Sequence, residues 1–228
     1  MVYVAQVKDR RTSVDDVFDD LFERITTLRL RPGDKISEAE VAAEFGVSRQ
    51  PVRDAFSRLA NHDLLLIRPQ RATTVRRFSM REIAKARFVR AAVEAEVLRR
   101  AARVWTAAGR ARLETELAAQ ADALADGDFA SFGRLDYAFH EAIAEMAGLP
   151  FAFEVIAAEK AKVDRLCLLS LRKEDRMPQL LEDHRAIAAA LDAGDPERAA
   201  AAGMIHLSRL DETIDAIAKT NADYFEPD

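Results

Sequence analysis

Residues 41–59 read VAAEFGVSRQPVRDAFSRL, and this stretch predicts two short helices joined by a sharp turn. Gly46 lies at the corner, where the left-handed backbone that ends a helix favours a residue without a Cβ. Ser48 is placed to begin the second helix, and Pro51 falls in its first turn, where a proline removes no backbone hydrogen bond. Apolar side chains recur on one face of both helices: Val41, Ala42, Phe45, Val47, Val52, Phe56 and Leu59. The stretch is therefore typical of a helix-turn-helix with a small core of its own.

The flanking segments extend this unit in both directions. Residues 13–28 (SVDDVFDDLFERITTL) have the apolar period of an amphipathic helix, with Ser13 as the expected N-cap. Downstream, residues 64–68 (LLLIR) and 73–77 (TTVRR) predict two short strands that form a hairpin. A helix, a helix-turn-helix and then a hairpin is the order of a winged helix. Residues 1–78 are therefore predicted to form a winged-helix DNA-binding domain.

The charges are divided unevenly along the chain. The 228 residues carry a formal net charge of −5, yet residues 45–77 contain seven arginines and two acidic residues, a local balance of +5. From residue 78 onward there are 20 Lys and Arg against 27 Asp and Glu, a balance of −7. A basic segment on an acidic chain is expected of a DNA-binding head on a sensor body, although a solvated charged face would give the same balance.

The second half of the chain predicts helices only. The sequence Ser79-Met80-Arg81-Glu82 has the pattern of a capping box and begins a new helix directly after the hairpin. Beyond it we expect six helices, at residues 80–105, 109–125, 128–147, 150–172, 177–193 and 196–219, followed by a loosely ordered tail. The chain is thus predicted to be mainly α, with residues 79–228 forming a six-helix antiparallel bundle.

Composition and cysteine usage predict a cytoplasmic protein. Hydrophobic residues make up 49% and charged residues 32% of the chain, which is ordinary for a soluble globular protein. Cys167 is the single cysteine, lies in the apolar run VDRLCLLSL, and is expected to be a buried structural thiol in a reducing compartment. No apolar run has the length of a membrane span, and the N-terminus lacks the pattern of a signal peptide, so no membrane partner is expected.

The first turn of the second helix in the helix-turn-helix carries the side chains expected to read DNA. Arg49 and Gln50 lie where the positive end of the helix dipole faces a groove, and Arg53 follows one turn later on the same face. Arginine can bond a guanine edge through two donors, and glutamine can pair likewise with adenine. We therefore expect Arg49 and Arg53 to specify bases and Ser48 to contact phosphate. The alternative is a solvated helix face.

Three of the four histidines lie on apolar faces of helices in the predicted bundle. Asp136 lies four residues before His140, so both project from one helix face, while His184 and His206 belong to two other helices. Taken singly, each histidine is more often a hydrogen-bonded core residue than a ligand. Three imidazoles and a carboxylate that converge in a bundle interior would suit one metal ion. The fourth histidine, His62, is expected to be a surface or capping residue.

The helix-turn-helix stretch resembles the GntR superfamily, whose pattern is Leu-Ala-x3-Gly-Val-Ser-Arg-x-Pro-Val-Arg-x-Ala-Leu. The residues in register are Gly46, Val47, Ser48, Arg49, Pro51, Val52, Arg53 and Ala55. The expected wing departs from the family pattern, because Ala72 and Thr74 stand where relatives carry a glycine and an aromatic residue, and Asp63 stands where they carry a glycine. Arg71 and Thr73 are nevertheless placed to contact phosphates.

The expected bundle resembles the FCD ligand-binding domain of FadR-type members of the same superfamily. The segments LDYAFHEAI, EDHRAIAAALDAGDPERAA and MIHLSRL carry this resemblance, and six helices rather than seven indicate the VanR-like branch. The resemblance implies one divalent transition metal per chain, with Zn²⁺ favoured and Ni²⁺, Fe²⁺ or Mn²⁺ as alternatives. Its ligands would be Asp136, His140, His184 and His206. Arg90, in RFVRAAVEAE, resembles a family arginine that faces the effector pocket, and its alternative role is an ion pair with Glu94.

These patterns together predict a DNA-binding transcription regulator, a repressor, and not an enzyme. We expect a homodimer on an inverted-repeat DNA operator, whose affinity is controlled by a small organic acid (a carboxylate effector) bound at the metal. A regulator that responds to the metal alone is one alternative, and metal titration with and without organic acids would separate the two. An all-helical metallohydrolase or oxygenase is another, but no second set of metal ligands, such as paired Glu-x-x-His, accompanies the first in the sequence.

Overall fold

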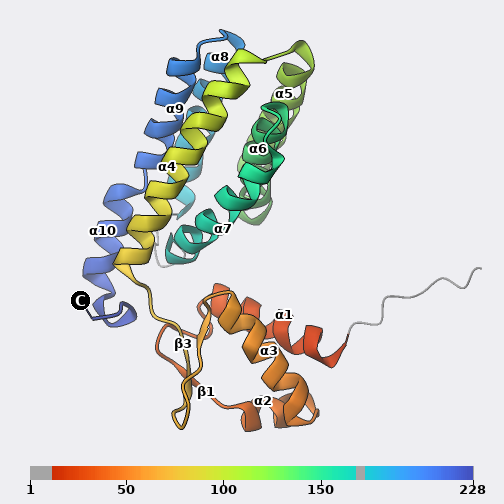
Figure 1. The fold of residues 1–228 in the computed structure, drawn as a ribbon, viewed down its shortest axis with the longest axis vertical. Helices are drawn as coiled ribbons and strands as arrows, with labels where there is room; N and C mark the ends of the chain where they lie inside the picture. Colours follow the sequence, from red (N-terminus) through yellow and green to blue (C-terminus); the bar gives the residue numbers. More distant parts are fainter. Residues whose placement is uncertain (1–11, 168–172, 228) are drawn as a thin grey trace, which may run out of the picture. The chain divides into compact units, whose positions relative to one another are not determined.

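The computed structural model describes residues 12–167 and 173–227, which fall into two compact units (Figure 1). One unit comprises residues 12–78 together with 223–227, and the other comprises residues 79–222 apart from 168–172. The predicted fold class is confirmed, since helices dominate both units and the strands are short. The predicted ranges 1–78 and 79–228 differ from this division at the C-terminus, where the tail groups with the first unit.

The first unit alternates helices with short strands. Its elements are α1 (Ser13–Thr26), β1 (Lys35–Ile36), α2 (Glu38–Phe45), α3 (Arg49–Asn61), β2 (Leu65–Leu66) and β3 (Thr73–Val75). The N-cap of α1 is Thr12 rather than Ser13, because the Thr12 side chain accepts a hydrogen bond from the Asp15 backbone and the Asp15 carboxylate accepts one from the Thr12 N–H at 3.1 Å. Gly46 ends α2 at φ +63°, the left-handed corner that the sequence predicted.

A small core fixes the orientation of α3. The fully buried side chains on α1 and α3 are Val17, Leu21, Ile25, Val52, Ala55, Phe56 and Leu59. With this face packed against α1, the opposite face of α3, which carries Arg49, Gln50 and Arg53, is exposed to solvent. The packing therefore leaves the basic face of α3 exposed to solvent.

The expected hairpin is part of a three-stranded antiparallel sheet with strand order β1-β3-β2. Strand β1 was missed by the sequence interpretation, which predicted no strand there. Thr74 pairs with Lys35 of β1 and with Leu66 of β2, so this position lies in the middle of the sheet. Asp63 and Gln70 have φ values of +57° and +58°, the conformation that glycine supplies most readily. Aspartate tolerates this conformation better than most residues, which explains how Asp63 stands at the place of a family glycine.

The second unit consists of helices alone among its described residues. They are α4 (Met80–Arg103), α5 (Ala107–Ala125), α6 (Phe129–Met146), α7 (Pro150–Cys167), α8 (Lys173–Asp192), α9 (Pro196–Ser208) and α10 (Asp211–Thr220). The last expected helix, at 196–219, is divided at Arg209 and Leu210, which raises the number of helices described here from six to seven. The helix count therefore gives no support to the VanR-like branch. The end of the expected helix 150–172 lies outside the described residues.

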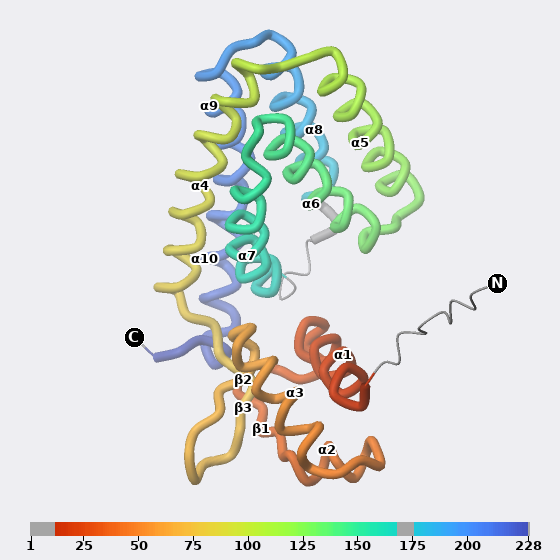
Figure 2. The backbone as a smooth tube through the Cα atoms, turned by 45° about the vertical axis from the view of Figure 1, so that its right-hand side comes forward, coloured from red at the N-terminus to blue at the C-terminus, as the bar shows by residue number. Residues whose placement is uncertain are grey.

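The helices of the second unit surround a single main core. Helix α4 packs against α7 and α9, α5 packs against α6 and α8, and α8 packs against α9, while α4 and α9 run in opposite directions (Figures 1 and 2). A Cβ on Gly203 of α9 would collide with the Leu98 side chain of α4, so the glycine allows these two helices to approach closely. No described helix is long and apolar enough to span a membrane.

The described part of the C-terminal tail is ordered, which corrects the expectation of a loose end. After a short 3-10 helix at Ala222–Tyr224, the Phe78 N–H donates to the Tyr224 carbonyl at 2.9 Å and the Glu226 N–H donates to the Phe78 carbonyl at 2.7 Å. The rings of Phe78 and Phe225 lie 5.6 Å apart and both side chains are buried. The tail therefore adds a parallel bridge and an aromatic pair to the first unit.

Candidate metal centre and nucleic-acid interface

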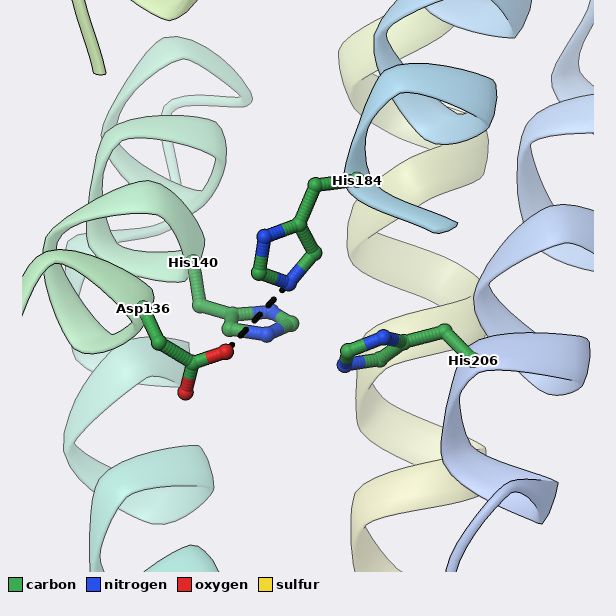
Figure 3. A group of neighbouring side chains, drawn as sticks. All are labelled: Asp136, His140, His184 and His206. Atoms are coloured by element: carbon green, nitrogen blue, oxygen red, sulfur yellow. Dashed lines mark ion pairs between the residues drawn. The ribbon is translucent and has the colours of Figure 1, made fainter. Parts of the chain in front are cut away.

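The structure brings the four predicted metal ligands together inside the second unit (Figure 3). Asp136 and His140 project from one face of α6, His184 projects from α8, and His206 from α9. Between 0% and 6% of each residue's surface is exposed, and one ligand atom from each lies within 4.8 Å of the others. Ligand atoms on opposite sides of an ion bound at 2.0–2.2 Å are about 4–4.4 Å apart. The four ligand atoms are therefore almost as close to one another as the ligands of a single bound ion.

Packing of apolar side chains and helices holds these rings in place. The ring of Phe139 stacks on His184, with centroids 4.2 Å apart and planes 18° apart. Gly203, one turn before His206, lets α9 approach α4 and so carries His206 into the interior. The residues that orient the ligands are thus as fully buried as the ligands themselves.

The protonation of His184 follows from its contact with Gln120, a fully buried residue of α5. The Gln120 amide nitrogen donates to the Leu135 carbonyl at 3.2 Å, so its oxygen must be the atom 2.7 Å from His184 Nδ1. His184 Nδ1 therefore carries the proton, and Nε2 presents a lone pair. Burial lowers the pKa of His184, with partial opposition from the Asp136 carboxylate, so the ring is neutral.

The lone pair of His184 Nε2 faces a carboxylate. Asp136 Oδ1 lies 3.3 Å from Nε2, and Nε2 has no hydrogen-bond partner among the described residues. Burial would raise the pKa of Asp136, but the charge of Lys160 opposes this effect, and the pKa lies well below its usual value. Asp136 is therefore ionised, and two electron-rich atoms face each other without a proton between them. A cation between them would remove this repulsion.

His140 is oriented by Glu94 of α4. Its Nδ1 lies 3.2 Å from Glu94 Oε2, while its Nε2 is buried and lacks a hydrogen-bond partner in the described part of the chain. Burial would raise the pKa of Glu94, but the charges of His140 and Arg90 outweigh it and lower the pKa to about 2. A carboxylate on the outer nitrogen of a histidine is the arrangement that directs the other nitrogen toward a metal.

His206 has a more loosely held carboxylate neighbour. Asp183 Oδ2 lies 4.0 Å from His206 Nδ1 and accepts a hydrogen bond from Arg209 Nε at 3.2 Å. Burial and the neighbouring imidazoles hold the pKa of His206 well below its usual value, so this ring is also neutral. The neutral rings of His184 and His206 and the ionised carboxylate of Asp136 are in the protonation states that metal binding requires.

Arg90, the residue expected to bind the effector, contacts Glu94 and also borders a hollow. Its Nε donates to Glu94 Oε1 at 2.8 Å, and only 4% of the residue is exposed. The ion pair that the sequence left as the alternative is therefore present. The hollow of about 140 Å³ lies between α4 and the α9–α10 junction, and its lining residues are Arg87, Arg90, Ala91, Met204, Leu207, Ser208 and Leu210. Two arginines and an apolar wall suit a small organic anion.

Comparison with known proteins identifies the family. Residues 13–75 match the bacterial regulatory proteins of the gntR family, and residues 86–209 match the FCD domain. The HTH-type transcriptional repressor RspR of Escherichia coli (strain K12) is 36% identical over 196 residues, which cover 86% of each chain. The chain belongs to the GntR family. An HTH-type transcriptional regulator in an unstable DNA locus of Streptomyces ambofaciens is 32% identical over 96% of this chain and 92% of that protein.

The fold of this GntR-family protein is also found in a solved structure. The transcriptional regulator GntR from Rhodococcus sp. RHA1 superposes with a TM-score of 0.69 at 23% identity, covering 89% of this chain and 97% of that one. The family match and the sequence relatives make the protein a DNA-binding transcription regulator with an FCD domain.

The candidate nucleic-acid interface of this GntR-family regulator is the exposed face of α3. Ser48 occupies the N-cap position but its side chain makes no capping hydrogen bond. Arg53 lies 3.2 Å from Glu38, and Gln50 donates to Asp54 at 2.9 Å, so both side chains have protein partners in the absence of DNA. Arg49 is exposed.

The wing of this regulator carries the other two predicted DNA contacts. Arg71 is exposed near the tip, and Thr73 is half-buried at the start of β3. His62 lies at the C-cap of α3, as expected for a surface or capping residue, with its ring 5.6 Å from that of Phe18.

Several residues around the candidate metal centre were missed by the sequence interpretation. They are Gln120, Lys160, Asp183 and, as the partner of His140, Glu94. The signal was present but weak, because each is a polar residue at a core-facing position of an amphipathic helix. Burial of a polar side chain demands a partner, and here those partners are the metal-ligand candidates or their neighbours.

Proposed function

We propose that this regulator is a repressor whose operator affinity is controlled by a small carboxylate effector bound at one divalent transition metal per chain. Asp136, His140, His184 and His206 are the proposed ligands. The observation that carries the metal site is the 3.3 Å approach of the His184 Nε2 lone pair to the ionised Asp136 oxygen in a fully buried position. A proton on Nε2 is disfavoured by burial, so a cation is the partner that fits.

The ligand set favours Zn²⁺, with Ni²⁺, Fe²⁺ or Mn²⁺ as alternatives. Three imidazole nitrogens and one carboxylate oxygen occupy four positions, and an ion that accepts five or six ligands keeps room for one carboxylate of an effector. Arg90 supports this assignment, because it borders the hollow beside α9 and contacts Glu94, the residue that orients His140. A second effector carboxylate at Arg90 would compete with Glu94 for the guanidinium.

The DNA half of the proposal is a homodimer that reads an inverted repeat. Arg49 and Arg53 would specify bases together with Gln50, while Ser48, Arg71 and Thr73 would contact phosphates. Arg53 and Gln50 must exchange their protein partners for DNA, whereas Arg49 is exposed for contact from the start. In a dimer with two-fold symmetry, each subunit would bind one half of the inverted repeat.

Metal content tests the central claim. Purified protein should carry about one transition metal per chain, and His184→Ala should lose it with a lower Tm. His62→Ala is the matched control, because His62 lies in the first unit and should leave the metal content unchanged. Full metal occupancy in the Asp136→Ala, His140→Ala double variant would show that the ligands are wrongly assigned.

Effector titration separates the proposal from a response to the metal alone. Carboxylates that raise the Tm of the metal-loaded protein should change its operator affinity by about 5- to 150-fold, the usual range of coupling between two sites. If the metal itself changes operator affinity and no carboxylate adds to the change, the regulator responds to the metal. Equal affinity for operator and random DNA at physiological salt would refute a sequence-specific regulator.

A further inference from the structure

Lys160 of α7 is a buried cation next to the proposed metal centre. Only 7% of the residue is exposed, and its Nζ lies 2.8 Å from Asp136 Oδ2 and 2.7 Å from Asp164 Oδ2. The ring of Tyr137 lies 4.3 Å from Nζ, and the Tyr137 hydroxyl donates to Asp164 Oδ2 at 2.9 Å. Burial of an ammonium group is costly unless charged partners surround it, so these partners fix the position of the Lys160 side chain.

The two oxygens of Asp136 have different neighbours. Oδ2 is bound by the Lys160 ammonium, whereas Oδ1 lies 3.3 Å from His184 Nε2, on the side of the proposed ion. A free carboxylate beside a divalent ion can coordinate through one oxygen or through both. With Oδ2 engaged by an ammonium, Oδ1 is the oxygen that lies beside the ligand nitrogen of His184.

We propose that Lys160 is a positioning residue that restricts Asp136 to one metal-bound oxygen and so keeps a coordination position open for the effector carboxylate. This inference rests on the proposed metal site and goes beyond it, because it assigns a role to a residue that is not a ligand. With the restriction, the protein supplies four donor atoms; without it, Asp136 would supply two oxygens, the protein would supply five, and the ion would keep fewer free positions.

The charge of Lys160 acts in the same direction. A positive charge that neutralises Asp136 leaves more of the ion's own charge available to attract a second anion. Removal of that charge should therefore strengthen the binding of the metal and weaken the binding of a carboxylate to it. If Lys160 had a purely structural role, its replacement would instead lower the metal affinity and the carboxylate affinity together.

The surroundings of Lys160 offer matched controls. Asp164 is the outer partner and is 41% exposed, so Asp164→Asn removes one contact of the ammonium and leaves the contact with Asp136. Lys162 lies two residues away on α7 and pairs with Glu159. Lys162→Met therefore removes a lysine from the same helix without touching Asp136.

The experiment uses the full-length protein loaded with Co²⁺, whose visible absorption reports the number of ligands, and acetate as the carboxylate probe. Co²⁺ affinity is measured by competition with a chelator, and acetate affinity by titration of the absorption. Lys160→Met should bind Co²⁺ at least as tightly as the wild type, with acetate affinity reduced about tenfold or more because the charge that neutralises Asp136 is lost. Lys162→Met and Asp164→Asn should bind acetate within about threefold of the wild type.

Two results would overturn the inference. One is a loss of Co²⁺ and acetate binding together in Lys160→Met while circular dichroism shows it folded, and the other is acetate binding equal to the wild type. Should Lys160→Met fail to fold, Lys160→Gln and Lys160→Arg provide the test: the neutral glutamine should lose acetate affinity and the charged arginine should retain it, and equal affinities would refute the role of the charge. A wild-type protein that takes up no Co²⁺ refutes the proposed metal site itself, which is a separate outcome.

Discussion

Replacement of Gln120 by leucine should lower metal affinity although Gln120 is not a proposed ligand. The amide oxygen accepts the His184 Nδ1 proton at 2.7 Å in a position with no solvent exposure, and this contact directs Nε2 at the centre. Leucine fills a similar volume but accepts no hydrogen bond. The ring would then lose the contact that fixes both its rotation and its tautomer.

The magnitude follows from the two contributions of this contact. A buried N–H without a partner costs about 1–3 kcal/mol of stability. Loss of the residue that orients a metal-bound histidine lowers metal affinity by about 10- to 100-fold, or about 1.4–2.7 kcal/mol. Since the metal stabilises only the folded chain, the gain in Tm on adding metal should shrink in the variant as well.

The assay is competition for Zn²⁺ with a chelating dye, combined with thermal unfolding with and without metal. Gln120→Glu is the comparison variant: its carboxylate accepts the Nδ1 proton but cannot donate to the Leu135 carbonyl, so it should bind metal more tightly than Gln120→Leu. Zn²⁺ affinity in Gln120→Leu equal to that of the wild type would refute the reasoning, and so would an equal loss in both variants.

Three further predictions concern the DNA contacts, acid stability and the tail. Arg49→Ala should cost about 1–3 kcal/mol of operator affinity and relax base preference. Arg71→Ala should weaken binding to operator and random DNA alike and reduce the slope of log affinity against log salt concentration by about 1. Fluorescence anisotropy at several salt concentrations measures both. His184 and His206 have pKa values below the usual 6.5, so the unfolded state binds more protons than the folded state as the pH falls. The metal-free protein should therefore lose up to about 1.4 kcal/mol of unfolding free energy per histidine for each pH unit below 6.5. Denaturant midpoints that do not change between pH 7 and 5 would contradict this. Phe225→Ala, which removes a side chain that is 8% exposed, should destabilise the first unit by about 2–3 kcal/mol, and Phe22→Ala, 39% exposed, should cost less in the same unfolding assay.

The helix-turn-helix could be predicted because its signals are local. The glycine corner, the proline in the first turn and the apolar face all lie within residues 41–59, and the structure has each where the pattern placed it. Strand β1 could not be predicted in this way, since two residues have no period and become a strand only by pairing with β3. The break at Arg209 and Leu210 has no glycine or proline to mark it, so the sequence indicates one continuous helix there.

The candidate metal ligands could be predicted, but the residues that orient them could not. Asp136 and His140 are four residues apart, a spacing that places both on one face of any helix. The contact of Gln120 with His184 joins α5 to α8, and that of Lys160 with Asp136 joins α7 to α6. Which buried polar residue meets which ligand depends on how the helices pack, and packing is not encoded in the period of any single helix.

We expect the proposed effector to act on DNA binding through helices α4 and α10. The chain crosses between the two units twice, once from Phe78 into α4 and once from α10 into the tail, and the tail pairs its backbone with the same Phe78. Arg87 of α4 forms an ion pair with Asp211 of α10 and also borders the hollow. A ligand that draws Arg87 toward itself would therefore weaken the link between the two helices that carry both crossings. An effector shifts an equilibrium only by its differential affinity for two arrangements of the protein. Competition of the ligand with Asp211 for Arg87, and with Glu94 for Arg90, would supply such a difference. It would thereby make effector binding and operator release interdependent.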